Sequence, residues 1–84
     1  MIIRTLFFAS LREKIGISEL TVELPRDATR DSLLQALQSE LDESRYETLS
    51  TPQVSIAINQ ELVKGEFTLQ EGDEVAFLPP ITGG

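Results

Sequence analysis

Apolar and polar positions alternate along several short stretches of the chain, and this pattern predicts a small sheet. Residues 2–9, IIRTLFFA, are rich in β-branched and aromatic side chains and predict a first strand. Its two faces carry different sets, Ile3, Thr5, Phe7 and Ala9 on one and Ile2, Arg4, Leu6 and Phe8 on the other. Because both sets are largely apolar, we expect both faces of this strand to be covered.

The next strand alternates more cleanly. In residues 18–24, SELTVEL, the apolar side chains face inward and Glu19, Thr21 and Glu23 face outward, which predicts a half-exposed strand. We expect it to pair with the first strand as a hairpin. The intervening residues 10–16, SLREKIG, predict only a short helical turn that stops at Gly16.

One longer segment has helical spacing. Over residues 30–41 the apolar positions recur every three or four residues, at Leu33, Leu34, Leu37 and Leu41. Thr29 is placed to cap the start of this helix, and Asp31 suits the positive end of its dipole. The polar residues 42–51 that follow predict a loop with at most one further helical turn.

Three strands are predicted in the second half. Residues 53–58, QVSIAI, place alternate apolar side chains on one face, and a turn at 59–61 leads to a short strand around Leu62 and Val63. Residues 69–78 contain a glycine turn and then a last strand with Val75 and Phe77 facing inward.

The predicted order of strands and helix indicates an α+β domain of the ubiquitin-like β-grasp type. It has a mixed sheet of about five strands, with one main helix packed on one face. No repeats or linkers interrupt the sequence, so we expect one domain over residues 1–78 and an extended tail over residues 79–84.

Composition excludes several kinds of chemistry. The chain has neither cysteine nor histidine, so it offers no thiolate nucleophile and lacks the commonest general base and metal ligand; we expect no metal site. Its net charge of −7 disfavours nucleic acid and anionic membranes and favours a protein partner with a basic docking face. Because the chain has neither a spanning apolar run nor a signal peptide, we expect a cytoplasmic protein.

The ending PPITGG is unusual for a small domain. Pro79 and Pro80 hold the chain extended, and six residues from there to the end reach about 20 Å. Gly83 and Gly84 have no Cβ and can therefore enter a narrow channel. A terminal carboxylate is a poor electrophile until another enzyme activates it, most simply as an acyl-adenylate made from ATP. The simplest alternative is an idle chain end.

Three stretches, LFFASLREKIG, EGDEVAF and PPITGG, resemble the small, sulfur-carrying subunits of molybdopterin synthase. The resemblance covers the whole chain. It implies that Gly84 is adenylated by a ubiquitin-activating-like adenylyltransferase, becomes a thiocarboxylate with sulfur from a donor enzyme, and gives that sulfur to cyclic pyranopterin monophosphate. It also implies a slim insertion path along the tail, formed by Gly83, Thr82, Ile81, Pro80 and Pro79.

The same resemblance implies a large partner subunit that supplies the catalytic side chains, in an assembly of two small and two large subunits. This chain would then be a non-catalytic sulfur donor that binds no cofactor, and the ATP would be used by the activating enzyme. From the outward phase of the predicted strands we expect Phe8, Leu62 and Leu78, with Leu6 beside them, to contact that partner. The alternative is that these are core residues or scattered surface side chains.

Other functions remain open at this stage. The sulfur carrier of thiamine synthesis shares the fold and the Gly-Gly end. A ubiquitin-like modifier, joined to lysines through Gly84, would use the same chemistry up to the adenylate. A structural adaptor with an idle tail would use neither sulfur transfer nor conjugation to lysines.

Overall fold

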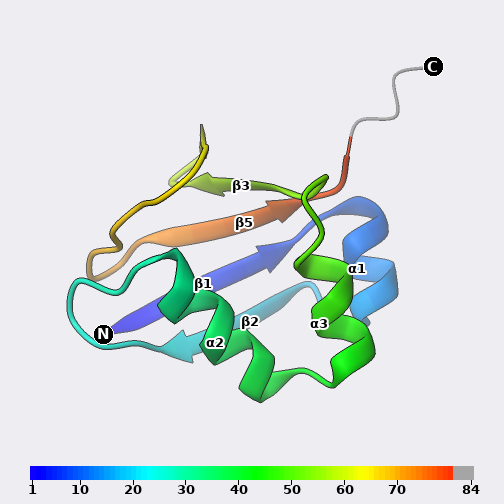
Figure 1. The fold of residues 1–84 in the computed structure, drawn as a ribbon, viewed down its shortest axis with the longest axis horizontal. Coiled ribbons are helices and arrows are strands. Elements are labelled where there is room, and N and C mark those ends of the chain that lie inside the picture. Colours follow the sequence, from blue (N-terminus) through cyan, green and yellow to red (C-terminus); the bar gives the residue numbers. More distant parts are fainter. Residues whose placement is uncertain (81–84) are drawn as a thin grey trace.

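The computed structural model describes residues 1–80 of the chain, which form a mixed sheet with helices on one side (Figure 1). The predicted α+β class is therefore confirmed. The elements follow one another as β1 (Ile2–Phe7), α1 (Ala9–Ile15), β2 (Glu19–Glu23), α2 (Arg30–Glu40), α3 (Glu43–Leu49), β3 (Ser55–Ile58), β4 (Glu61–Val63) and β5 (Glu74–Leu78).

The sheet has the strand order β2-β1-β5-β3-β4. β1 and β5 run parallel in its centre, and every other neighbouring pair is antiparallel. The predicted pairing of the first two strands is confirmed, with Leu6 opposite Glu19 and Ile2 opposite Glu23. The first and last strands of the chain are thus neighbours in the centre of the sheet, and β5 ends beside the end of β1 (Figure 1).

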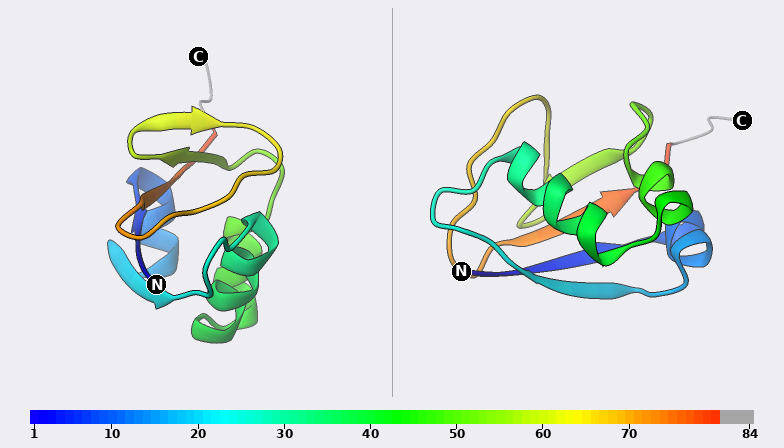
Figure 2. Two further views of the ribbon diagram at one scale, coloured as in Figure 1. Left: turned by 90° about the vertical axis from the view of Figure 1, so that its left-hand side faces the viewer. Right: turned by 60° about the horizontal axis from the view of Figure 1, so that its bottom comes forward.

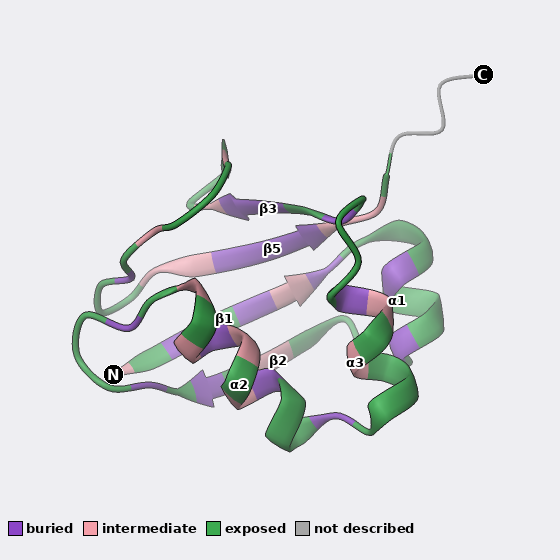
Figure 3. Ribbon diagram, viewed as in Figure 1, coloured by how far each residue is buried: buried purple, intermediate pink, exposed green. Residues whose placement is uncertain are grey.

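The core lies between the sheet and the helices α2 and α3, which cover the same side of it (Figure 2). Phe7 of β1 and Phe77 of β5 are fully buried there, with ring centroids 5.8 Å apart. Val75 is buried beside them, as the alternation predicted. In Figure 3 the buried positions follow the central strands and the helix surfaces that face them. The hydroxyl of the buried Thr5 donates a hydrogen bond to the carbonyl oxygen of Leu20, so this buried polar group is satisfied.

The main helix begins as predicted. The Thr29 side chain accepts a hydrogen bond from the Ser32 backbone N–H, and the Ser32 hydroxyl accepts one from the Thr29 N–H, which completes a capping box. Leu33 and Leu37 turn fully into the core, and Leu41 is buried just after the helix ends.

Two segments are more helical than predicted. The segment expected to form a short turn is the seven-residue helix α1, closed by Gly16 at φ 87°, whose N–H donates to the Arg12 carbonyl oxygen. The segment expected to be a loop contains α3, also of seven residues, capped by Asp42, which accepts from the Arg45 N–H. Each is too short to be stable alone, and packing against the other supplies what the local pattern lacks.

The first strand is shorter than predicted and covered on one side only. It ends at Phe7, because Ala9 takes a positive φ of 51° and starts α1. None of the described helices covers the face that carries Ile2, Arg4 and Leu6, so the expectation that both faces would be covered was wrong. The face of the sheet that carries these residues is called the helix-free face below.

Candidate partner-binding face and tail root

An apolar row crosses the helix-free face from β1 to β4. Strand register places Leu6 of β1 opposite Ala76 of β5, Ala76 opposite Ala57 of β3, and Ala57 opposite Leu62 of β4. Opposed residues in a sheet direct their side chains to the same face. Because Phe77 and Ile56 point into the core, Ala76 and Ala57 point away from it. Four apolar side chains therefore lie side by side where no described helix covers them.

Three of the four residues expected to contact a partner border one depression. Phe8, Leu62 and Leu78 line a hollow of about 540 Å³ on this face, and Leu6 lies next to it in the row but does not line it. Phe8 is 42% exposed and Leu62 is 70% exposed, while Leu6 and Leu78 are half-buried. None of the four is buried beneath the helices, and their role in binding stays a prediction.

The floor of the hollow consists of residues that sequence reasoning did not single out. Ala57 and Ala76 are only 5% and 9% exposed, although no described helix covers them. Ser55 and Gln60 supply the polar atoms at the edge. The only signal in the sequence was the small size of two residues at outward-facing strand positions, and it does not reveal that the two alanines are neighbours.

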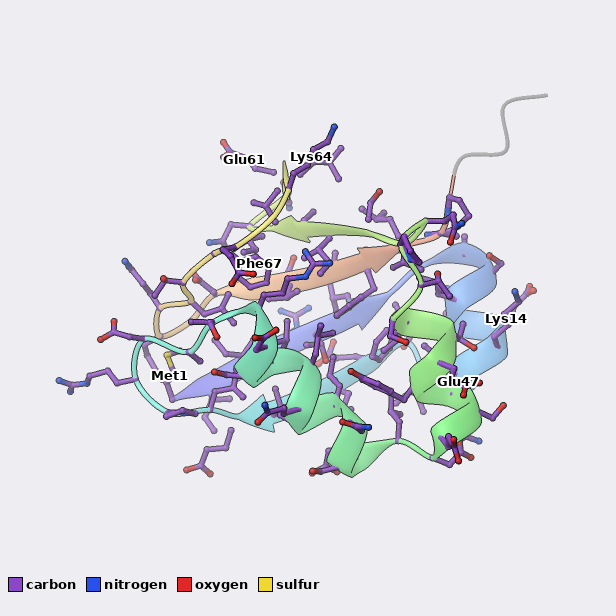
Figure 4. All side chains as sticks on the ribbon, in the orientation of Figure 1. Met1, Lys14, Glu47, Glu61, Lys64 and Phe67 are labelled. Atoms are coloured by element: carbon purple, nitrogen blue, oxygen red, sulfur yellow. The ribbon has the colours of Figure 1, made fainter. Side chains whose placement is uncertain are left out.

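The tail root is part of the same surface. Pro79 and Pro80 line the apolar hollow, and they also line a more polar groove between α1 and α3 that includes Lys14 and Glu47 (Figure 4). The chain therefore leaves the sheet at the border of two depressions. The predicted insertion residues Ile81, Thr82, Gly83 and Gly84 lie outside the described residues.

A charged row bounds the apolar one on the sheet. Arg4 of β1 lies between two carboxylates, with its Nε 3.2 Å from Glu19 Oε1 and its Nη1 3.3 Å from Glu74 Oε2. Thr21 of β2 lies directly opposite Arg4. Arg4 and Glu74, which lie opposite each other on β1 and β5, separate the hollow from the exposed Ile2 at the far end of β1, whereas Glu19 lies opposite Leu6 at the end of the apolar row. At the outer edge, Glu61 and Lys64 project from β4 and the residue after it (Figure 4).

Within residues 1–80, no three acidic, histidine or cysteine side chains cluster closely enough to hold a metal ion. The same part of the chain contains no helix of the length and apolarity needed to cross a bilayer. The residues that line the hollow are all uncharged. Taken together, the described geometry is suited to contact another protein's apolar surface.

Comparison with protein families gives one matching model, described as the ThiS family, over residues 5–84. Among curated relatives, the molybdopterin synthase sulfur carrier subunit of Escherichia coli K12 is 38% identical over 84 residues, covering 98% of this chain and 99% of the relative. The protein of the same name from Haemophilus influenzae is 37% identical over 82 residues, covering 98% and 99%.

Solved structures share the fold. SAMP1 from Haloferax volcanii superimposes with a TM-score of 0.79 at 25% identity, with both chains covered completely. Subunit 1 of the Helicobacter pylori molybdopterin-converting factor, solved in a complex with subunit 2, gives 0.63 at 25% identity, also with complete coverage. Urm1 from Trypanosoma brucei gives 0.74 at 18% identity, covering 99% of this chain and 95% of that one, and supports the fold alone. These matches confirm the predicted ubiquitin-like β-grasp.

Proposed function

Because this chain belongs to the ThiS family and to the molybdopterin synthase sulfur carrier subunits, we propose that it carries sulfur on its C-terminal glycine for molybdenum cofactor synthesis. The observation that carries the proposal is the junction at Pro79 and Pro80. There the root of the tail forms one side of an uncharged hollow on the helix-free face. A subunit that binds this face is positioned to receive the tail as well.

The chemistry takes place on the main chain. The carboxylate of Gly84 attacks the α-phosphorus of ATP on an activating enzyme, forming the acyl-adenylate and releasing pyrophosphate. Sulfur at the oxidation level of hydrosulfide, supplied by a donor enzyme, then forms a C–S bond as the bond to AMP breaks. The thiocarboxylate sulfur then attacks a side-chain carbon of cyclic pyranopterin monophosphate and displaces an oxygen there, which joins the carrier to the substrate as a thioester. Water cleaves the thioester between the Gly84 carbonyl carbon and the sulfur, which restores the carboxylate and leaves the sulfur on the substrate.

The proposal assigns the remaining tasks to partners. A large subunit binds the helix-free face through Phe8, Leu62 and Leu78, with Leu6 alongside, and supplies the catalytic side chains. Two copies of each subunit assemble, in the cytoplasm. This chain binds no cofactor of its own, and the activating adenylyltransferase uses the ATP. The relative from Helicobacter pylori, solved as a complex of subunit 1 with subunit 2, supports the existence of such a partner.

Deleting Gly84 tests the proposal directly. Since the glycine has no side chain to pack, the variant should fold with an unchanged thermal midpoint. Sulfur transfer should fall by at least about 100-fold, because each residue advances the tip by about 3.3 Å and an error of about 1 Å at a reacting centre already costs that much. The assay is molybdopterin formation with purified large subunit, activating enzyme, ATP and a sulfur donor.

A second variant carries one extra glycine after Gly84, which keeps every residue of the tail and shifts only the position of its tip. It should be as inactive as the deletion. Turnover by either variant at the rate of the unaltered chain would show that the terminus does not carry the sulfur.

A protein modifier is the second candidate, favoured by the match to SAMP1, a protein also solved under the name small archaeal modifier protein 1. The two candidates diverge after the adenylate. A carrier accumulates a species in which one oxygen is replaced by sulfur, visible in the intact mass. A modifier instead appears joined through Gly84 to lysines of other proteins in its native host.

A further inference from the structure

We propose that the hollow on the helix-free face is a socket for one large apolar side chain of the partner subunit, which lies over Ala57 and Ala76 between their larger neighbours. The inference rests on the proposed function, because it names the chemistry of the partner at the face through which the carrier is proposed to dock. Neither alanine belongs to the residues that the sequence had marked for contact.

The socket arises from the order of side-chain sizes along the row. Leu6 and Leu62 stand at its ends and the two alanines lie between them. An alanine methyl rises little above the strand, so larger neighbours stand above it on both sides. This explains why Ala57 and Ala76 are almost inaccessible on a face without a described helix. The centre of the face is therefore hollow where a uniform row of leucines would have made it flat.

The lining determines which occupant fits. Apolar side chains and proline rings make up most of the wall, and the two polar residues, Ser55 and Gln60, are uncharged. A charged side chain would lose its hydration here without gaining a partner, which is costly. A volume of about 540 Å³ is more than one side chain fills, and it accommodates a ring or a long aliphatic side chain together with the backbone that carries it. Aromatic residues in such desolvated pockets commonly supply most of the energy of an interface.

The position of the tail root indicates that the occupant comes from the subunit that receives the tail. Pro79 and Pro80 border the socket, and the four residues after them reach only about 13–14 Å. A protein that accepts the terminus must therefore have surface within that distance of the socket. A second copy of this chain is the competing occupant, and the experiment below distinguishes the two.

Filling the socket tests the inference. Ala57→Leu places a large side chain on the floor while its backbone and the core remain unchanged. Binding of the large subunit from the same organism, measured by titration calorimetry, should weaken at least about 30-fold, the loss expected for a blocked hot spot. Thr21→Leu is the matched control. It adds a leucine to the same face in the Arg4 row, at a position that does not line the hollow, and should leave the affinity within about 3-fold.

A second measurement, by NMR, tests directly whether the partner covers Ala57 and Ala76. In the complex of alanine-labelled carrier with unlabelled large subunit, the methyl resonances of Ala57 and Ala76 should both shift. Alanines outside the hollow, such as Ala36 on α2, should not. If Ala57→Leu lowers the thermal midpoint, Leu62→Ala replaces it in the titration, because this variant removes one wall of the socket without crowding a strand.

The outcomes separate this inference from the proposed function. If Phe8→Asp abolishes binding but Ala57→Leu binds normally, the docking face stands and the socket is wrong. If Ala57→Leu alters only self-association of the carrier, measured by sedimentation, the occupant is a second copy and the inference is overturned. If the Gly84 deletion retains full sulfur transfer, the proposed function fails, whatever the socket binds.

Discussion

Replacing Phe8 with aspartate should separate partner binding from folding. Phe8 follows β1 on the helix-free face and forms part of the wall of the hollow. Phe8 is 42% exposed, and a partner that covers this part stabilises the complex in proportion to the area buried. Burying a whole phenylalanine side chain contributes roughly 1.5–3 kcal/mol. The exposed part therefore contributes about 1 kcal/mol, and the variant forfeits it.

The carboxylate adds a larger penalty. An ionised group held in an apolar interface without a partner costs about 3–5 kcal/mol. The sum, about 4–6 kcal/mol, corresponds to at least about 1,000-fold weaker binding. The unbound protein does not pay this penalty, because there the aspartate side chain stays in water.

The folded chain should lose much less stability. Giving up the buried part of Phe8 costs about 1–2 kcal/mol, and each 1 kcal/mol lowers the thermal midpoint of a domain of this size by about 4–8 °C. Aspartate offsets part of that loss, because position 8 is the N-cap of α1 and has no side-chain hydrogen bond at present. We expect a net loss below about 1.5 kcal/mol.

Titration calorimetry with the large subunit measures the first effect, and thermal unfolding followed by circular dichroism measures the second. Thr21→Asp is the control, because it places the same charge on the same face at an exposed position opposite Arg4. It should bind like the unaltered chain. If Phe8→Asp binds within about 10-fold of that chain, or if both variants weaken equally, the face described here is not the partner-binding surface.

Two further predictions concern the scaffold. Leu33→Ala should lower the free energy of unfolding by about 2–5 kcal/mol in a urea titration, because Leu33 is fully buried beneath α2; a loss below about 1 kcal/mol would contradict the packing. Thr29→Ala should cost about 0.5–2 kcal/mol in the same titration by removing the cap of α2, whereas Thr29→Ser, which keeps a hydroxyl, should restore most of it.

Where solvent meets only one side of an element, the sequence predicted it well. Strict alternation marked β2 and the inward side chains of β5, and the leucine spacing with Thr29 marked α2. The lengths of the short helices α1 and α3 were underestimated because each has only one or two buried anchors, Leu11 and Ile15 in one and Leu49 in the other. Such helices depend on tertiary contacts that a local pattern does not contain.

The site was predictable in part for a similar reason. Phe8, Leu62 and Leu78 are bulky and outward-facing, so strand phase alone placed them on one face. The hollow between them depends on register, because Ala57 and Ala76 become neighbours only when β3 pairs with β5 across 19 positions of sequence. An alanine in the sequence does not indicate which side chains will be its neighbours on the adjacent strands. The contacts of Arg4 with Glu19 and Glu74 depend on the pairing of β1 with β2 and with β5, and they were missed as well.

The distribution of charge separates binding strength from the rate of encounter. The chain carries 14 acidic and 7 basic residues, yet no charged residue lines the hollow. At its border Arg4 balances one of two carboxylates, which leaves a single surplus negative charge. Charges outside a contact act over about 8–10 Å in salt and mainly change how fast partners meet. Apolar contact that excludes water instead determines how long they stay together. If the proposed socket binds a basic partner, we therefore expect salt to slow the encounter, while the lifetime of the complex depends on Phe8, Leu62 and the alanine floor.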